Sequence, residues 1–339
     1  MKNISTTSQD TLDTDKELSW YSKEKSDKNK KPHGWLYKIG MGLLFVFLIY
    51  LLWPIVENWP KIWSNLQQAN GSLVLLAIAI FSLTFAFTGL AMTVIATKAM
   101  PFRQTSLIQL AMAFTYKVFP AGLGGPGLMY RYATVAGYST EAGLGYVGTV
   151  ELIYFSAWLL YFIPVVILSG GLKPLGISHD FTMGWKMFFI GAIVAIVAYV
   201  ILKAFGLVSK LKEKLNEVAN SFVSIIKSPG KSSVSLGLMI LSYSCTNVAF
   251  YISLRAVGVD IGFWQTVFVY LIFNSIGSCG PAPGGIGTVE AALIGGLMLV
   301  GVDAAAATTG VMIFRGVSFW LPTLPGYLAF RYGINHKFI

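Results

Sequence analysis

Charged residues are scarce in this 339-residue chain. They make up only 12% of it, whereas hydrophobic residues make up 55%. Water-soluble domains carry about 25% charged residues, so the composition excludes an ordinary soluble domain. Residues 73–97 and 236–254 contain no Asp, Glu, Lys or Arg, and each run is long enough to cross a hydrocarbon core of about 30 Å. These runs predict an all-α polytopic membrane protein.

Cysteine and histidine are scarce as well. The two cysteines, Cys245 and Cys279, lie in apolar sequence, which predicts neither a disulfide nor a metal site. The three histidines lie far apart and outside the apolar runs, so we expect no zinc site and no His-centred catalytic site. The sequence also lacks a GxxxxGK[ST] phosphate-binding motif. We therefore expect no catalytic residue, no metal and no cofactor.

The formal net charge is +10, yet we do not expect nucleic acid as a partner, because membrane orientation explains the excess. Lys and Arg are enriched in cytoplasmic loops. Lysines are concentrated in residues 2–38 and 203–231, and Arg331 and Lys337 lie near the end of the chain. Loops assigned to the outside hold only Lys61, Lys173, Lys186 and Arg255. This bias predicts a multi-pass protein of the cell membrane with both termini in the cytoplasm.

The chain divides into a tail and a transmembrane domain. Residues 1–34 are polar and almost free of aliphatic side chains, which predicts a disordered cytoplasmic tail. The transmembrane domain is expected at 35–339. A connector at 171–232 contains apolar residues at helical spacing over 206–228, which predicts an amphipathic helix on the cytoplasmic surface. The expected spanning helices lie at about 36–56, 73–97, 143–169, 185–204, 234–256 and 304–330.

Two further apolar segments are interrupted by Gly and Pro. Residues 104–138 contain PAGLGGPG between two short apolar pieces, and residues 263–300 contain CGPAPGGIG. Apolar pieces of about 10–14 residues are more often re-entrant than spanning, so we expect two re-entrant hairpins made of broken helices. Their break residues are Gly124, Gly125, Gly127, Pro281, Pro283, Gly284, Gly285 and Gly287.

The predicted topology makes residues of about 73–170 and about 233–331 upside-down copies of each other. The Gly-Gly-x-Gly motifs of the two breaks align, and Glu151 aligns with Arg315 when four residues are inserted. Inverted repeats with broken helices near the midplane are typical of transporters. An accidental match between Gly-rich loops is the alternative.

Five ionisable residues interrupt the apolar segments and are the candidate substrate-binding residues: Lys117, Arg131, Glu151, Glu290 and Arg315. A charge at the bilayer centre costs at least about 2.5–3.5 kcal/mol, so each needs a partner or a wet cavity. The sequence allows two arrangements. In one, Glu151 pairs with Arg315; in the other, the pairs form within each repeat, with Glu151 near Arg131 and Arg315 near Glu290. We favour the second arrangement.

These charges have two expected roles. They hold the broken helices together as internal ion pairs, or the cations bind a lipid phosphate through charge-assisted hydrogen bonds. Lys117 and Arg131 flank the first break and are the stronger phosphate candidates.

Two motifs resemble a known family. GPAPGGIGTVEAALIGG followed by GVMIFRGVSFWLP resembles the second-half signature of the lysylphosphatidylglycerol synthase transmembrane-domain family, which includes the flippase half of the multiple peptide resistance factor. The first half is similar to the family pattern at Gly127, Arg131 and Glu151. It departs from that pattern at Leu128 and Leu152, where the family usually has Glu and Arg.

The resemblance covers about 36–331 and implies a flippase-like domain that moves a phospholipid or a modified lipid between leaflets. Lipid synthesis belongs to members fused to a soluble aminoacyl-transferase domain, so we expect no enzymatic activity here. The alternatives are an accessory protein and a membrane-embedded enzyme acting on lipid-linked sugars or phospholipid headgroups, with Glu151 and Glu290 as its carboxylates. The expected partners are membrane lipids with phosphate-bearing headgroups; a homo-oligomer and a separately encoded lipid-modifying enzyme are further alternatives.

Overall fold

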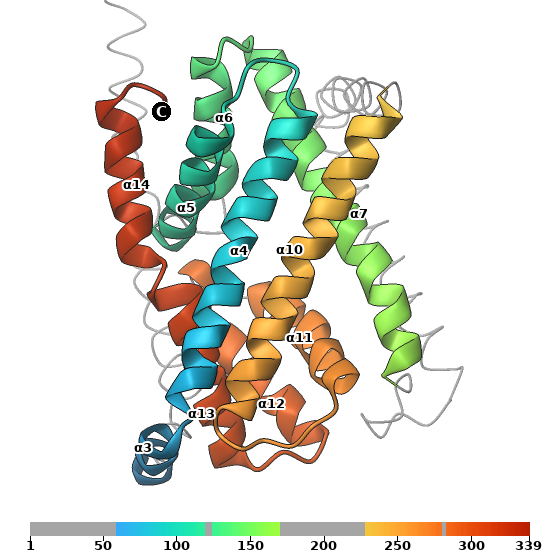
Figure 1. Ribbon diagram of the computed structural model, residues 1–339, viewed down its shortest axis with the longest axis vertical. Coiled ribbons are helices and arrows are strands. Elements are labelled where there is room, and N and C mark those ends of the chain that lie inside the picture. Colours follow the sequence, from blue (N-terminus) through green and yellow to red (C-terminus); the bar gives the residue numbers. More distant parts are fainter. Residues whose placement is uncertain (1–58, 119–123, 170–227, 280–282) are drawn as a thin grey trace, which may run out of the picture. The chain divides into compact units, whose positions relative to one another are not determined.

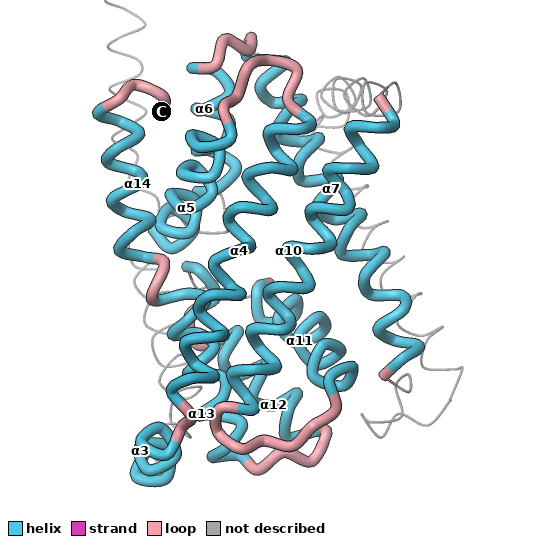
Figure 2. Tube along the Cα trace, viewed as in Figure 1, coloured by secondary structure: helices cyan, strands magenta, loops and turns pink. Residues whose placement is uncertain are grey.

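The computed structural model describes residues 59–118, 124–169, 228–279 and 283–339. All of them belong to the structural unit that spans residues 52–339. Every regular element in these ranges is helical and none is a strand, as Figure 2 shows. The following predicted segments lie outside the described residues: the tail at 1–34, the helices at 36–56 and 185–204, and the amphipathic helix at 206–228 except for its last residue.

The described helices occur in two series along the chain. The first comprises α3 (Trp59–Gln68), α4 (Gly71–Ile95), α5 (Phe102–Val118), α6 (Gly124–Val135) and α7 (Thr140–Leu168). The second comprises α10 (Pro229–Arg255), α11 (Phe263–Ser278), the 3-10 turn η3 (Pro283–Gly285), α12 (Thr288–Leu299), α13 (Ala304–Arg315), the π-helix η4 (Gly316–Trp320) and α14 (Thr323–Asn335). From α4 and from α10 onward, each series runs through one long helix, two short helices and a long helical segment.

Three helices begin where the sequence supplies a capping side chain. The Oδ1 atom of Asn70 accepts hydrogen bonds from the backbone N–H groups of Ser72 and Leu73 at the start of α4. Ser139 caps α7 and Asp303 caps α13 in the same way. Each cap satisfies N–H groups that have no partner within the first turn.

Four helical segments are long and apolar enough to cross a membrane: Gly71–Ile95, Thr140–Leu168, Pro229–Arg255 and Ala304–Asn335. They correspond to four of the predicted spans. Large apolar side chains on them are exposed, including Leu75 at 68% and Ile167 at 72%. Extensive exposed apolar surface is unfavourable in water but suits contact with lipid. The fold is that of an all-α polytopic membrane protein.

The last long segment differs from the prediction, because 304–330 is not one regular helix. Helix α13 ends at Arg315, and the N–H of Leu321 donates to the carbonyl of Gly316 at 2.8 Å, an i to i+5 bond. Pro322 follows and caps α14, and Pro325 lies in the first turn of that helix. Proline has no N–H to donate and clashes with a preceding turn, which accounts for the division of this segment.

Helices α4 and α10 form a long antiparallel pair (Figure 1). At one end, the N–H of Asn70 donates to the carbonyl of Ala256 at 2.8 Å. At the other end, the Oγ of Ser235 donates to the carbonyl of Ala91 at 2.9 Å. Helices α4 and α10, the first long helix of each series, therefore run in opposite directions.

Each series also packs a short helix against the final segment of the other. Helix α14 packs on α5, where Gly326 lies so near that a Cβ atom would stand 2.6 Å from the carbonyl oxygen of Leu110. Helix α11 packs on α7 through a small buried cluster that includes Val165 and Phe268. The two contacts correspond to each other if α5 matches α11 and α7 matches α13–α14.

The first break is shorter than predicted, because α6 already begins at Gly124. Gly124, Gly125 and Gly127 therefore lie in the first turn of a helix. A Cβ atom on Gly125 would meet the ring of Tyr116 at 2.0 Å, so a larger residue at this position would displace that ring. Pro126 does not prevent helix formation there, since the first turn has no intrahelical partner for its N–H groups.

Candidate functional site

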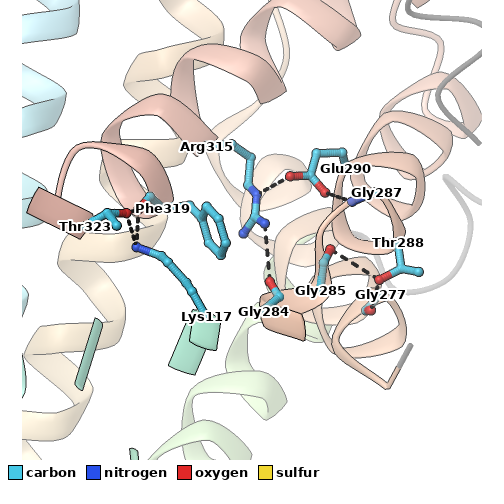
Figure 3. Close-up of polar contacts among 10 residues, drawn as sticks. All are labelled: Lys117, Gly277, Gly284, Gly285, Gly287, Thr288, Glu290, Arg315, Phe319 and Thr323. Atoms are coloured by element: carbon cyan, nitrogen blue, oxygen red, sulfur yellow. Dashed lines mark hydrogen bonds and ion pairs between the residues drawn. The ribbon is translucent and has the colours of Figure 1, made fainter. Parts of the chain in front are cut away.

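Arg315 and Glu290 form a buried ion pair between α13 and α12. The Nε of Arg315 donates to the Oε1 of Glu290 at 2.6 Å, and the two side chains are only 10% and 12% exposed. The Oε2 of Glu290 accepts the N–H of Gly287 at 2.8 Å, and the Nη2 of Arg315 donates to the carbonyl of Gly284 at 3.4 Å (Figure 3). Both carboxylate oxygens are thus engaged, and Arg315 is bound to the backbone of the second break.

Three glycines shape this break. Gly284, Gly285 and Gly287 have φ angles of 62°, 66° and 81°, in a region that side chains disfavour and glycine adopts freely. At the end of the turn, the hydroxyl of Thr288 donates to the carbonyl of Gly277 at 2.7 Å. This hydrogen bond connects the start of α12 to the end of α11. The Gly-Gly-x-Gly motif is therefore required by backbone conformation in the second half.

Lys117, at the end of α5, connects the first break to the division in the last segment. Its Nζ donates to the Oγ1 of Thr323 at 2.6 Å and also to the carbonyl of Phe319. The ring of Phe319 lies between two cations, with its centroid 4.5 Å from the Nζ of Lys117 and 4.0 Å from the Cζ of Arg315 (Figure 3). A Cβ atom on Gly284 would meet this ring at 2.8 Å. Lys117, which precedes the first break, and Gly284, in the second break, therefore both lie against the ring of Phe319.

A cavity of about 360 Å³, called here the central cavity, lies between helices of both series. Its charged lining residues are Glu151 on α7 and Arg315 on α13. Its polar lining residues are Thr84, Thr88, Gln109, Ser242, Thr246, Asn274 and Ser318, and its aromatic ones are Phe81, Phe85, Tyr116, Tyr154, Tyr270 and Phe314. Binding sites for small molecules are commonly about 300–1,000 Å³, so the cavity can hold a polar group.

The polar lining residues were not predicted from the sequence, although a signal was present. Thr84 and Thr88 are spaced by four residues on α4, as are Ser242 and Thr246 on α10. Residues four apart share one face of a helix. Hydroxyl groups repeated at this spacing within uncharged spans indicate a wet face, and the hydroxyls of Thr88 and Ser242 lie 2.9 Å apart.

The structure contains only one of the two ion pairs favoured from the sequence. Arg315 lies beside Glu290 as predicted. Arg131 is exposed on α6 and does not line the central cavity. Among the described residues, neither Arg131 nor Glu151 has an ion-pair partner. The alternative pair of Glu151 with Arg315 is not formed, although both residues line the same cavity.

The other predicted break positions are distributed differently. Pro283 begins the turn η3, whereas Pro281 lies outside the described residues. A Cβ atom on Gly127 would meet no atom within 4 Å, so nothing in its surroundings requires a glycine. Phe319 and Thr323 were not predicted to belong to the site, because neither residue type interrupts an apolar run.

Two known membrane proteins are similar to parts of this chain. The chain is 29% identical over 89 residues to a UPF0104 membrane protein of Methanothermobacter thermautotrophicus, covering 26% of this chain and 27% of that protein. It is 29% identical over 121 residues to a UPF0104 membrane protein of Pyrococcus horikoshii, covering 34% of this chain and 36% of that protein. The matched segments thus span only about a third of these relatives or less.

A family match covers much more of the chain. The sequence profile described as "Lysylphosphatidylglycerol synthase TM region" matches residues 36–326. That range includes α4 to α13, the central cavity and the ion pair of Arg315 with Glu290. By this match, the chain belongs to the lysylphosphatidylglycerol synthase transmembrane-region family.

Proposed function

We propose that this membrane protein is a lipid translocase of the cell membrane, which moves a phospholipid or a modified lipid between the two leaflets. Its expected partners are lipids with phosphate-bearing headgroups. A homo-oligomer or a separately encoded lipid-modifying enzyme is proposed as a further partner. The family supports a lipid-related role, and the site supports translocation.

One observation carries this proposal: a cavity of about 360 Å³ with a mixed polar and apolar lining lies among apolar helices where the two broken segments approach each other. Glu151 and Arg315 line it together with hydroxyl and amide side chains. A lipid headgroup that crosses a bilayer must exchange its contacts with water for polar contacts in the protein, because burial of an unpartnered polar group costs about 2–7 kcal/mol. A polar cavity inside an apolar bundle provides such contacts.

The packing of the helices supports the proposed inverted repeat. The counterpart helices α4 and α10 run antiparallel, and the contact of α5 with α14 corresponds to that of α11 with α7. A repeat that is inverted presents the same cavity to either side when one half moves against the other, which is how transporters with inverted repeats achieve alternating access. The two broken segments would then line the path of the headgroup.

The distribution of charge supports cytoplasmic termini. Lys98 follows the end of α4, and Lys231 lies in the first turn of α10, which packs antiparallel beside α4. Arg331 lies near the end of α14. Lys and Arg favour the cytoplasmic side of a membrane protein. We therefore propose that this end of the bundle faces the cytoplasm.

The alternative of a membrane-embedded enzyme receives less support. It required Glu151 and Glu290 to face one aqueous cavity as a carboxylate pair. Glu290 does not line the central cavity, and both of its oxygens are engaged by Arg315 and Gly287. A carboxylate held in this way is suited to fixing the second break.

A leaflet-exchange assay tests the proposal. The purified chain is reconstituted into liposomes whose lipids carry a fluorescent acyl chain, and a membrane-impermeant reductant then quenches the outer leaflet. We expect quenching to continue into the inner-leaflet pool in proteoliposomes and to stop at the outer leaflet in protein-free liposomes. Identical quenching in both, from folded protein, would overturn the proposal.

Two variants of α10 link exchange to the central cavity. Thr246→Trp places a large side chain in the cavity, and we expect it to abolish exchange. The matched control is Leu241→Trp on the same helix, where the native side chain is 48% exposed and does not line the cavity. Exchange that survives Thr246→Trp in folded protein would contradict a path through this cavity.

A further inference from the structure

The last helical segment is divided between two hydrophobic clusters. Ala329 of α14 packs in one cluster with residues of α5 and α6, among them Ile108 and Tyr132. Phe314 of α13 packs in a second cluster with residues of α12, such as Leu293. The two clusters have no residue in common. Helices α13 and α14 are therefore held by different parts of the molecule, although only η4 and a short turn separate them in the chain.

The chain passes from one cluster to the other at Leu321 and Pro322. Val317 of η4 still belongs to the second cluster, whereas α14 begins at Thr323. The N–H of Leu321 donates to the carbonyl of Gly316 in the π-helical pattern, and Pro322 has no N–H with which to continue the helix. Hinges are formed by a few residues at the ends of elements, where the backbone can absorb a rotation. This turn has that position and that chemistry.

Lys117 connects the two sides of the turn. It lies on α5, which packs on α14, yet its Nζ donates to the carbonyl of Phe319 in η4 as well as to the Oγ1 of Thr323 (Figure 3). The hydroxyl of Thr323 donates to the same carbonyl at 2.9 Å. The ring of Phe319 completes the contact, with its centroid 4.5 Å from the Nζ of Lys117. These contacts oppose a rotation of α14 against η4.

The two cations that flank the ring of Phe319 are bound in different ways. Arg315 lies on the same segment as the ring and is paired with the carboxylate of Glu290. Lys117 has no ion-pair partner within the described part of the chain, and its partners are a carbonyl, a hydroxyl and a ring. Breaking a buried ion pair leaves an uncompensated charge, whereas water can replace uncharged partners. The contact on the Lys117 side of the ring is therefore the one suited to open and close.

We propose that Leu321 and Pro322 form a hinge and that Lys117 is its latch. When Lys117 releases Phe319, α14 moves together with α5 against α12 and α13. The conformation described here is the latched one. Lys117 and Phe319 are thus positioning residues, which act on the arrangement of the helices. The link between this movement and leaflet exchange rests on the proposed translocase function, whereas the movement itself does not.

A distance measurement tests the latch without any transport. Spin labels are attached at Leu328→Cys on α14 and Leu299→Cys on α12 in a full chain without native cysteines, and both native side chains are 57% exposed. We expect a narrow distribution of label distances with Lys117 present and a broader or two-peaked one in Lys117→Met. The control pair, Leu328→Cys with Phe102→Cys on α5, should give the same distribution in both, because these two helices move together.

An unchanged distribution for the α12–α14 pair in folded Lys117→Met would overturn the latch. Equal broadening of the control pair would also overturn it, because a general loosening of the fold would then explain the result. If Lys117→Met does not fold, Phe319→Leu replaces it. That variant keeps the backbone carbonyl but removes the ring between the two cations, and it should broaden only the distribution of the α12–α14 pair.

The hinge is tested by a second substitution. Pro322→Ala supplies the N–H that the helix lacks at the turn, so α13 and α14 become more rigidly joined. Added to Lys117→Met, it should restore the narrow distribution. The matched control Pro325→Ala lies in the first turn of α14, where an N–H has no intrahelical partner, and should leave the distribution broad. The same result from both proline substitutions would overturn the assignment of the hinge.

Leaflet exchange separates this inference from the proposed function. We expect Pro322→Ala alone to slow exchange without lowering the melting temperature, and Pro325→Ala to leave the exchange rate unchanged. A latch-dependent movement in a chain that shows no leaflet exchange would support the hinge and contradict the translocase. Exchange that is equally fast in the wild type and in folded Pro322→Ala would support the translocase and overturn the hinge as part of its path.

Discussion

Gly277 of α11 lies so close to Val289 of α12 that a Cβ atom on the glycine would stand 2.5 Å from the Cα of the valine. The two helices flank the second break, and the hydroxyl of Thr288 donates to the carbonyl of Gly277 at this point. The contact is backbone against backbone, so a side chain cannot be accommodated by a change of rotamer. The close approach of α11 and α12 therefore requires a residue without a side chain at position 277.

Gly277→Ala should lower the thermal stability of the chain in detergent. The added methyl group must push α12 away from α11, and overpacking of this kind costs about 1–3 kcal/mol. The matched control is Gly237→Ala on α10, where a Cβ atom would meet nothing within 4 Å. Alanine is about 1 kcal/mol more favourable than glycine within a helix, so this variant should be neutral or stabilising. Equal melting temperatures for the two variants would contradict the close contact.

Neutralising one member of the buried ion pair should be strongly destabilising. Arg315→Met leaves the carboxylate of Glu290 buried without its partner, and Glu290→Gln leaves the guanidinium in the same position. Removal of one partner of a buried pair costs about 3–5 kcal/mol. The double variant Arg315→Met with Glu290→Gln should lose less stability than the sum of the two single variants, since residues in contact couple. Additive losses in thermal unfolding would show that the pair is not formed.

Lys117→Met should destabilise the chain, whereas Arg131→Met should leave its melting temperature unchanged. The first substitution keeps the length of the side chain but removes donors to the Phe319 carbonyl and to Thr323. Hydrogen bonds from charged groups contribute about 1.5–3 kcal/mol. Arg131 is exposed and unpaired among the described residues. A larger loss for Arg131→Met would contradict the different surroundings of these two cations.

The proposed orientation can be read from single cysteines. With Cys245 and Cys279 replaced by Ser, Asp260→Cys should react with a membrane-impermeant thiol reagent in intact cells. Lys98→Cys should react only after permeabilisation, because that end of the bundle is proposed to face the cytoplasm. Both native side chains are exposed, so access does not differ between them. The reverse labelling pattern would show that the chain has the opposite orientation in the membrane.

The helices were largely predictable because their causes are local. Long apolar runs of spanning length predicted α4, α7 and α10 to within a few residues, and proline and glycine marked the breaks. The division of the last span was missed, even though Pro322 and Pro325 stand at the point where it occurs. A long apolar run shows that a segment can cross the membrane. It does not show where the hydrogen bonds within that segment change from the α-helical to the π-helical pattern.

The candidate site was predictable only in part. Glu290 and Arg315 stood out because charges in apolar runs need partners, and a pair within the second repeat was the favoured arrangement. The same argument favoured Glu151 with Arg131, and that pair is not formed. Lys117 is 202 residues away from Phe319 and 206 residues away from Thr323 in sequence. No local pattern specifies a contact of that kind, since it depends on how α5 packs against the last segment.

The sequence by itself determined that the chain is an α-helical membrane protein, where Gly and Pro interrupt its two shorter apolar segments, and which few residues carry charge inside it. These properties follow from hydrophobicity and backbone stereochemistry, which act within a few residues. Only the tertiary structure decided which charges neutralise each other and which remains free. Arg315 is paired with Glu290, whereas Glu151 lines the central cavity and has no ion-pair partner among the described residues. The physical reason is that pairing depends on distances between helices, and helix packing sets those distances.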